Sequence, residues 1–134
     1  AELWKLPIIY AIENNHYAMG TSVERSASEP DFYKRGESFQ IPGLQVDGMD
    51  VLAVRGAAEV ALEWTRSGKG PIILELKTYR YRGHSMSDPA KYRTREEVQD
   101  YRENRDPIER AAKDLAAMGV AEEELKAIDK QIKD

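Results

Sequence analysis

Two short apolar segments, each followed at once by a polar stretch, constrain the fold of this chain most strongly. They are residues 7–12 and residues 71–79, and both are rich in β-branched and aromatic side chains. The first is apolar on both faces, which predicts a strand buried on both sides, as inside a parallel sheet. One long helical pattern lies between the two segments. The order strand, helix, strand therefore predicts an α/β fold with right-handed crossover connections.

The segment between the two strands predicts one helix and one long loop. Asp50 is a suitable N-cap, and residues 67–68, Ser-Gly, should end the helix because glycine is favoured just past the last turn. Residues 46–48 predict a short strand and turn before it. Residues 21–45 have no sustained period, so we expect a long loop there. The expected apolar stripe of the helix is Val51, Val54, Ala58, Ala61, Leu62 and Thr65.

The last third of the chain predicts a tail of amphipathic helices. Residues 94–97, Thr-Arg-Glu-Glu, match a capping box, which starts a helix near residue 95 that runs to about residue 103. Asp106 and Pro107 are a favoured cap and first helical residue for a second helix, which Gly119 should close. A last helix is expected from about Ala121. The apolar positions of these two helices are Ile108, Ala111, Ala112, Leu115, Leu125, Ile128 and Ile132.

Composition excludes several classes of function. There are no cysteines, so disulfides, Cys-based zinc sites and thiol nucleophiles are excluded. The net charge is -4, which gives no indication of nucleic acid as a partner. No apolar run approaches the roughly 20 residues of a membrane helix, so no membrane is expected. Residues 1–7 lack the features of a signal peptide and contain no initiator Met, and we interpret the chain as a piece of a longer protein.

The polar stretch after the first strand offers neutral oxygen ligands. It contains Asn14, Asn15, His16 and Tyr17 at the carboxyl end of the strand, where open α/β sheets bind their ligands. Side-chain amide and backbone carbonyl oxygens suit Mg²⁺ or Ca²⁺. Asn-rich turns are also common for purely conformational reasons, because Asn tolerates left-handed backbone and bonds its own backbone. On spacing alone, the conformational role is favoured over the metal.

The polar stretch after the second strand suits an anion. It offers two guanidinium groups, from Arg80 and Arg82, together with His84, Ser85 and Asp88. Arginine and histidine at this edge of a sheet are good donors to a phosphate. The alternative is a solvated loop whose arginines lie along the surface. A Ser-His-Asp triad is disfavoured, because triads are usually assembled from separate segments.

These segments resemble one enzyme family. Residues 13–22, Glu-Asn-Asn-His-Tyr-Ala-Met-Gly-Thr-Ser, resemble the end of the thiamine-diphosphate motif, which opens with Gly-Asp-Gly and closes with Asn-Asn. Residues 79–89 and 92–97 resemble the active-site loop of the alpha subunits of pyruvate dehydrogenases, within the thiamine-diphosphate-dependent 2-oxo acid dehydrogenase family. The similarity runs in order from residue 3 to at least residue 106. Three shorter segments agree with the same family: 33–36, 41–43 and 46–50.

The resemblance implies a fold, an activity and partners. The fold is the C-terminal part of a three-layer thiamine-diphosphate-binding fold, with residues 1–93 in the cofactor-binding domain and residues 94–134 as a helical tail. The implied activity is decarboxylation of pyruvate with thiamine diphosphate and Mg²⁺, followed by transfer of the acetyl group to the lipoyl group of an acyltransferase. The implied partner is a beta subunit in an alpha-two, beta-two heterotetramer. The location would be the bacterial cytoplasm, or the mitochondrial matrix of a eukaryote.

The resemblance also assigns residues. Asn15 should give its side-chain oxygen to the metal and contribute to cofactor binding, and Tyr17 should give its backbone carbonyl to the metal. His84 should reach the diphosphate side of the site as a catalytic and cofactor-binding residue. Ser22 and Ser85 stand where mitochondrial relatives are phosphorylated. A phosphate on Ser85 would add about -1.5 to -2 charges beside an anionic cofactor, which predicts loop disorder and inhibition.

Two departures from the family pattern shape these expectations. The opening Gly-Asp-Gly is absent, so the metal's carboxylate ligand is missing and these 134 residues alone are expected to be inactive. Residues 88–92 are one residue shorter than the mitochondrial pattern, which favours a bacterial member and weakens the expectation of kinase control. Branched-chain 2-oxo acid and acetoin dehydrogenases are alternatives, although residues 85–89 favour pyruvate. A non-catalytic assembly piece is an alternative of another class.

Overall fold

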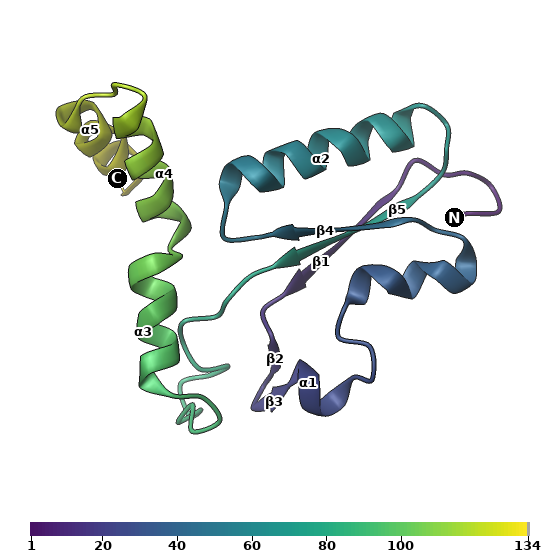
Figure 1. Cartoon of the computed structure of the whole chain (residues 1–134), viewed down its shortest axis with the longest axis horizontal. Helices are drawn as coiled ribbons and strands as arrows, with labels where there is room; N and C mark the ends of the chain where they lie inside the picture. Colours follow the sequence, from purple (N-terminus) through teal and green to yellow (C-terminus); the bar gives the residue numbers. More distant parts are fainter. Residues whose placement is uncertain (134) are drawn as a thin grey trace.

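A three-stranded parallel sheet forms the centre of the molecule in the computed structural model, which describes residues 1–133 (Figure 1). The last strand in sequence is central and pairs in parallel with both others, so that Ala11 and Leu44 both stand opposite Leu74. The predicted α/β fold is therefore confirmed. The strands are, in spatial order, β1 (Ile9–Asn14), β5 (Ile72–Lys77) and β4 (Gly43–Asp47).

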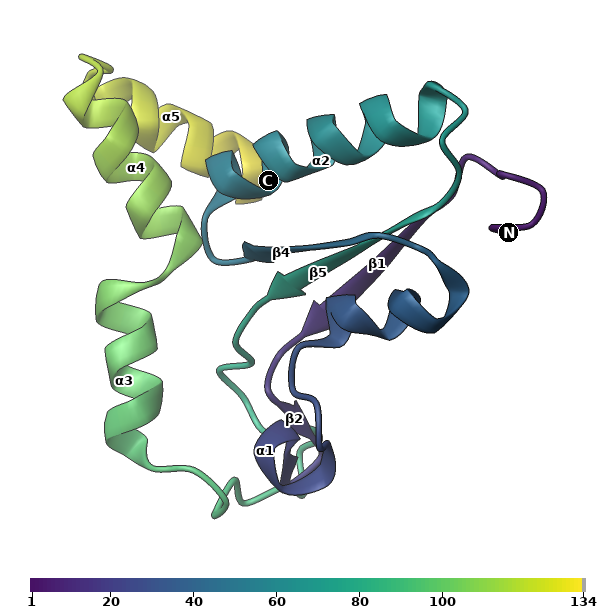
Figure 2. The same cartoon turned by 45° about the vertical axis from the view of Figure 1, so that its right-hand side comes forward.

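Helices cover the sheet from both sides and make three layers. The long helix α2 (Val51–Arg66) and the 3₁₀ helix η1 (Phe32–Phe39) lie on opposite sides of the strands in Figures 1 and 2. Close approach of η1 depends on a missing side chain, because a Cβ on Gly43 would lie 2.2 Å from the Tyr33 carbonyl oxygen. The buried apolar side chains are Val23, Met49, Ala61, Ile72, Ile73, Leu74 and Tyr79.

Local signals place α2 as predicted. The Asp50 carboxylate accepts hydrogen bonds from the backbone N–H groups of Leu52 (3.0 Å) and Ala53 (3.1 Å), which caps the first turn. Gly68 follows the last turn with a φ of +75°, a conformation that glycine adopts without strain. The predicted apolar stripe is wrong in part. Its Val51 and Leu62 are 56% and 37% exposed, because the helix turns these positions away from the sheet.

The first predicted strand is not buried on both sides. The strand β1 begins at Ile9 rather than at residue 7, and its Tyr10 is 42% exposed. It stands at the edge of the described sheet, where α2 and η1 cover it incompletely. The strand that is buried on both faces is β5, whose first four residues are all buried. The prediction of an interior strand for residues 7–12 is therefore wrong, because β5 takes the central position in the sheet.

The expected loop over residues 21–45 is also wrong. This region folds into short elements that have neither the period of a long helix nor that of a strand, so periodicity does not detect them. The polar stretch before it likewise contains a small strand that pairs antiparallel with the next one. The missed elements are β2 (Tyr17–Ala18), β3 (Thr21–Ser22), α1 (Val23–Ser26), η1 and the first residues of β4.

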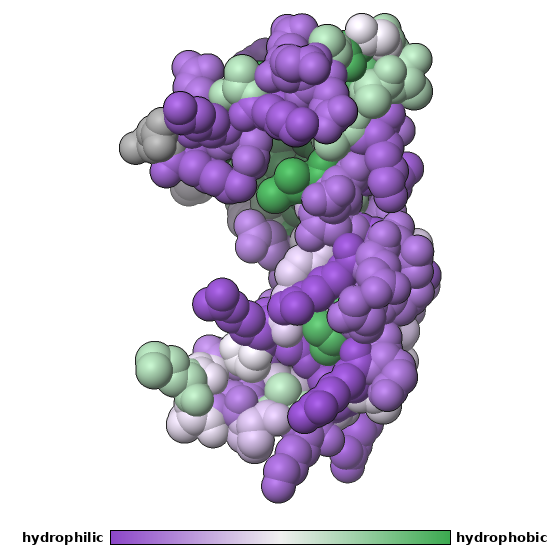
Figure 3. All heavy atoms as spheres, turned by 90° about the vertical axis from the view of Figure 1, so that its left-hand side faces the viewer, coloured by the Kyte–Doolittle hydropathy of each residue, from purple (hydrophilic) through white to green (hydrophobic). Residues whose placement is uncertain are grey.

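The helical tail is confirmed as α3 (Arg95–Asn104), α4 (Pro107–Ala117) and α5 (Glu122–Lys133), and it runs beside the sheet in Figure 1. Asp106 caps α4 and Thr94 caps α3 as predicted. The capping box at Thr94 is only half formed, because the Glu97 carboxylate binds tyrosine hydroxyls instead. The predicted apolar position Ile108 is 74% exposed, and Figure 3 shows this side of the molecule as mostly hydrophilic with scattered hydrophobic areas. No helix within residues 1–133 is long and apolar enough to cross a membrane.

Candidate functional site

The polar stretches that follow β1 and β5 lie side by side. The Arg80 guanidinium donates to the Met19 carbonyl oxygen (2.9 Å) and to the Tyr92 hydroxyl (3.1 Å). The rings of Tyr17 and Tyr92 have centroids 5.2 Å apart. Both stretches leave the carboxyl ends of parallel strands, so this edge is the candidate site, and Figure 2 shows the connection after β5 descending toward β2.

Two consecutive side-chain turns shape the segment after β1. The Asn14 side-chain oxygen accepts from the backbone N–H of His16 (3.1 Å), and that of Asn15 accepts from Tyr17 (3.2 Å). His16, between Asn15 and Tyr17, has a backbone φ of +70°, in the left-handed region. The conformational role of these asparagines is therefore real. An amide oxygen has two lone pairs, so Asn15 keeps acceptor capacity for a cation, and its role as a metal ligand stays a prediction.

A buried carboxylate that the sequence analysis did not single out holds this turn. Glu75, in the middle of β5, has no exposed surface and accepts from the Asn14 side-chain amide (2.7 Å). Its other oxygen accepts from the backbone N–H of Tyr33 (3.0 Å) and from the Gln45 side chain (3.2 Å). One carboxylate thus connects β1, β4, β5 and η1. The sequence feature that could have identified Glu75 is a charged residue in the middle of an otherwise apolar strand.

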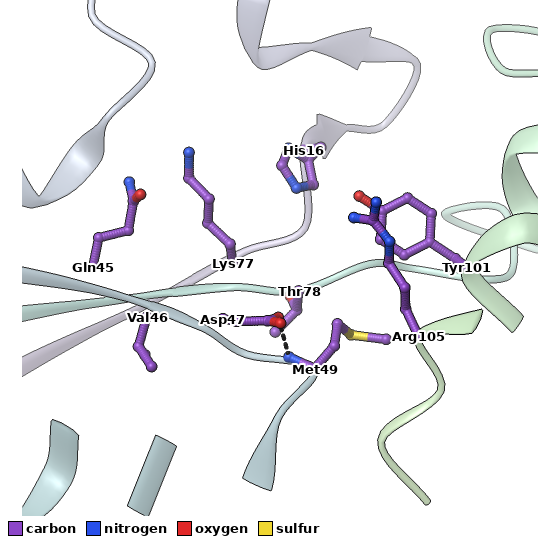
Figure 4. Close-up of a pocket in the computed structure, with 9 residues that line it drawn as sticks. All are labelled: His16, Gln45, Val46, Asp47, Met49, Lys77, Thr78, Tyr101 and Arg105. Atoms are coloured by element: carbon purple, nitrogen blue, oxygen red, sulfur yellow. Dashed lines mark hydrogen bonds between the residues drawn. The ribbon is translucent and has the colours of Figure 1, made fainter. Parts of the chain in front are cut away.

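A cavity of about 360 Å³ opens at the carboxyl ends of the three strands (Figure 4). Figure 4 shows His16 between the side chains of Lys77 and Arg105. Burial, and then the charge of Lys77, lowers the pKa of His16, so its imidazole is neutral at pH 7. Lys77 and Arg105 were not expected here, because they come from distant elements. The cavity is lined by His16, Gln45, Val46, Asp47, Met49, Lys77, Thr78, Tyr101 and Arg105.

Arg93, another residue that the sequence analysis missed, ties the base of the second loop. Only 9% of it is exposed. Its guanidinium donates to the carbonyl oxygen of Arg80 and to that of Tyr81 (2.8 Å). The guanidinium carbon also lies over two aromatic rings, 5.3 Å from the ring centroid of Tyr79 and 5.8 Å from that of Tyr92. The two ends of the loop, residues 80 and 93, are thereby held together.

Glu97 joins the tail to both loops. One of its carboxylate oxygens accepts from the hydroxyls of Tyr17 (3.2 Å) and Tyr79 (2.8 Å). Burial raises the pKa of both tyrosines, and the Glu97 charge adds to the effect, so both hydroxyls remain donors at neutral pH. The ring of Tyr79 also stacks on that of Tyr101 in α3, with the two ring centroids 3.9 Å apart. Helix α3 therefore contributes to the shape of the site.

Asp88 organises the tip of the second loop beside a second cavity of about 560 Å³. Its carboxylate accepts from the backbone N–H groups of His84 (2.7 Å) and Ala90 (2.8 Å) and from the Tyr92 hydroxyl (2.8 Å), and these bonds lower its pKa. Since Asp88 binds the backbone of His84, it does not orient the imidazole as a triad would. The cavity is lined by Met19, Gly20, His84, Ser85, Ser87, Asp88, Pro89, Lys91 and Tyr92.

The predicted site residues occupy different parts of this edge. Asn15 and Tyr17 are half-buried on the turn, Ser22 pairs with Tyr17 in the β2–β3 hairpin, and His84 and Ser85 are exposed at the loop tip. The cavity beside His84 includes neither Asn15 nor Tyr17. Within residues 1–133, no three His, Asp or Glu side chains form a cluster that could hold a metal. The structure brings the two loops together, and the roles of these five residues stay predictions.

A parallel α/β sheet with two polar loops meeting at its carboxyl edge is the arrangement in which open α/β proteins bind their ligands. The chain belongs to the dehydrogenase E1 component family, whose model matches residues 1–134. The family resemblance in the sequence is thereby confirmed.

Bacterial and mitochondrial proteins are both similar to the chain. It is 62% identical to the pyruvate dehydrogenase E1 component subunit alpha of Zymomonas mobilis, over 99% of this chain and 38% of the relative. It is 64% identical to the protein of the same name from Rhizobium meliloti, over 100% and 39%. It is 56% identical to the human somatic mitochondrial form, over 99% and 34%. The chain thus spans less than two-fifths of the length of these relatives.

Proposed function

We propose that this chain forms one side of the thiamine diphosphate site of a pyruvate dehydrogenase, as the C-terminal part of its alpha subunit. The observation that carries the proposal is that residues 13–22, which resemble the end of the cofactor motif, meet residues 79–89 and 92–97, which resemble the active-site loop, at the carboxyl edge of the sheet. The three relatives described above are all named as pyruvate dehydrogenase subunits, which favours pyruvate over branched-chain 2-oxo acids and acetoin.

The proposed reaction belongs to an assembly. The alpha subunit would work with a beta subunit in an alpha-two, beta-two heterotetramer, decarboxylate pyruvate and pass the acetyl group to the lipoyl group of an acyltransferase. The assembly would lie in the cytoplasm of a bacterium, or in the mitochondrial matrix of a eukaryote. The relatives include both bacterial and mitochondrial proteins, so the location follows the source.

The residues of this edge suit the cofactor and its metal. The Asn15 amide oxygen and the Tyr17 carbonyl would be neutral ligands for Mg²⁺, and a local hydrogen bond already holds the Asn15 side chain in place. His84 would donate to the diphosphate from the exposed loop tip. When bound, thiamine diphosphate supplies the electron sink for loss of CO₂. The chain's own contribution is to hold the loops: Arg93 closes one, and Glu97 links both to α3.

Substrate comparison in the complete enzyme tests the function. The intact alpha subunit is co-purified with its beta subunit, and steady-state rates are measured with pyruvate, 3-methyl-2-oxobutanoate and acetoin. We expect kcat/KM for pyruvate to exceed the others by at least about tenfold, since the two extra methyl groups of 3-methyl-2-oxobutanoate must fit the pocket and acetoin has no carboxylate to lose. The rate should require thiamine diphosphate and Mg²⁺. A branched-chain preference would reassign the substrate, and an assembly without cofactor-dependent activity would support a non-catalytic role.

Phosphorylation is a further part of the proposal. Ser85 is exposed at the loop tip, three residues from Asp88, whereas Ser22 is only half-exposed in the hairpin. A phosphate on Ser85 would repel both Asp88 and the diphosphate and would inhibit the enzyme. Ser85 is therefore the better candidate of the two for control by modification.

Replacing His84 by alanine in the intact heterotetramer should weaken thiamine diphosphate binding or acetyl transfer by about tenfold, the worth of one hydrogen bond to a charged group. The fold should be unaffected, because the exposed side chain makes no hydrogen bond within residues 1–133 and the backbone N–H is the group that binds Asp88. Calorimetry for the cofactor and steady-state rates measure the effect. Met86→Ala, in the same exposed loop, is the matched control. Unchanged cofactor binding and turnover in His84→Ala would show that His84 is only a solvated loop residue with no role at the site.

A further inference from the structure

Glu75 is a buried carboxylate that accepts hydrogen bonds from neutral groups. It has no exposed surface, and within residues 1–133 the three groups that donate to it come from Asn14, Tyr33 and Gln45. Its neighbours in β5, Leu74 and Leu76, are apolar. Burying a carboxylate costs free energy even when it is hydrogen-bonded, and an apolar replacement would leave these three donors without this acceptor. The glutamate therefore serves as a shared acceptor for groups from β1, η1 and β4.

Asn14, which is 5% exposed, is the donor that links Glu75 to the turn after β1. Its N–H₂ group donates to Glu75 at 2.7 Å, while its side-chain oxygen accepts from the backbone N–H of His16 at 3.1 Å. The Asn14 carbonyl oxygen also accepts from Thr78 at 2.9 Å, which anchors the strand end. His16 has a left-handed φ of +70°, which costs about 1 kcal/mol or more for a residue with a Cβ. The bond to the His16 N–H offsets part of that cost.

We propose that Glu75 is a positioning residue that sets the orientation of the Asn14 amide, and through it the turn that presents Asn15 and Tyr17. A carboxylate only accepts hydrogen bonds, so Asn14 must turn its N–H₂ group toward Glu75. Its oxygen then faces the backbone N–H of His16, two residues further along the turn. This inference rests on the proposed function, in which Asn15 and Tyr17 hold the metal of the cofactor.

Exchanging the two functional groups tests the orientation. In Glu75→Gln, the new oxygen can serve Tyr33 and Gln45, which leaves its N–H₂ group facing that of Asn14. The Asn14 amide must then flip, and its N–H₂ group meets the His16 N–H. Adding Asn14→Asp restores acceptors on both sides, because the introduced carboxylate accepts from the introduced amide and from the His16 N–H. The double variant also keeps the net charge of the wild type.

The measurements use the complete alpha and beta assembly. Calorimetry gives the affinity for thiamine diphosphate at several Mg²⁺ concentrations, and thermal unfolding without metal or cofactor gives stability. We expect Glu75→Gln to weaken the Mg²⁺-dependent affinity roughly tenfold, as for residues that orient metal ligands. The double variant should recover most of it. Glu63→Gln, on the exposed side of α2, is the matched control and should change neither quantity.

The outcomes separate the inference from the proposed function. A lower Tm with unchanged cofactor affinity in Glu75→Gln would show that Glu75 has only a structural role. A loss of affinity that the double variant does not recover would exclude the orientation of the Asn14 amide as its cause. Either result overturns the inference. If Glu75→Gln does not fold, Asn14→Ala must reproduce the tenfold loss, since it removes the same link, and unchanged affinity there overturns the inference too. A wild-type assembly that does not bind the cofactor overturns the proposed function, and the inference with it.

Discussion

Asn15→Ala should weaken Mg²⁺-dependent binding of thiamine diphosphate to the assembled enzyme by roughly 100-fold. Even residues that only orient metal ligands change affinity by about 10 to 100-fold, and Asn15 is proposed to be a ligand itself. The substitution also removes the bond to the Tyr17 N–H, which has a length of 3.2 Å. The proposed carbonyl ligand of Tyr17 would be displaced as well. Calorimetry at saturating Mg²⁺ measures the loss.

Two further variants separate ligation from conformation at Asn15. Asn15→Asp keeps an oxygen for both the Tyr17 N–H and the cation, so it should retain affinity within about tenfold of the wild type. Asn104→Ala is the matched control, because that amide lies on the exposed side of α3 and donates to the Asp100 carboxylate at 2.8 Å, away from the site. If Asn15→Ala and Asn104→Ala bind the cofactor equally well, Asn15 has only the conformational role.

Arg93→Ala should have the second large effect, a loss of about 3 kcal/mol in the free energy of unfolding together with most of the activity. The guanidinium is buried and donates to the carbonyl oxygens of Arg80 and Tyr81, and each hydrogen bond to a charged group contributes about 1.5 to 3 kcal/mol. The variant leaves both carbonyls without these partners. The loop that carries His84 loses its closed base. Chemical denaturation and steady-state rates of the intact assembly measure the two losses.

Two further variants, Arg93→Lys and Arg55→Ala, are compared in stability with Arg93→Ala. Arg93→Lys keeps the charge but not the planar fork that reaches two carbonyls, so it should recover less than half of the lost stability. Arg55→Ala removes an exposed guanidinium that pairs with Glu59 at 3.1 Å on α2, and it should cost less than about 0.5 kcal/mol. Equal stability of Arg93→Ala and Arg55→Ala would mean that the loop is held by other contacts.

Helix ends were the part of the fold that the sequence predicted best. Asp50, Thr94 and Asp106 each cap the helix they were expected to cap, and Gly68 and Gly119 follow helix ends with positive φ. A cap is decided by a side chain and the backbone two or three residues away. Such short-range chemistry is fully contained in a few consecutive letters of the sequence.

Burial was predicted less well. The doubly apolar pattern of residues 7–12 was assigned to an interior strand, yet Tyr10 is 42% exposed and β5 takes the central position. The short elements between residues 21 and 45 were missed altogether. Burial depends on which elements lie on each side of a strand, and those neighbours come from distant parts of the chain. A local pattern contains no information about them.

The candidate site divides in the same way. The sequence by itself determined the family, the two polar stretches and their common place at the carboxyl ends of strands, because residue type and strand direction are enough for that. Only the tertiary structure decided that Arg93 closes the second loop, that Glu97 accepts from Tyr17 and Tyr79, and that Glu75 accepts from Asn14. The physical reason is that Glu75 and Asn14 are 61 positions apart, and only the parallel pairing of β1 with β5 brings them within 2.7 Å.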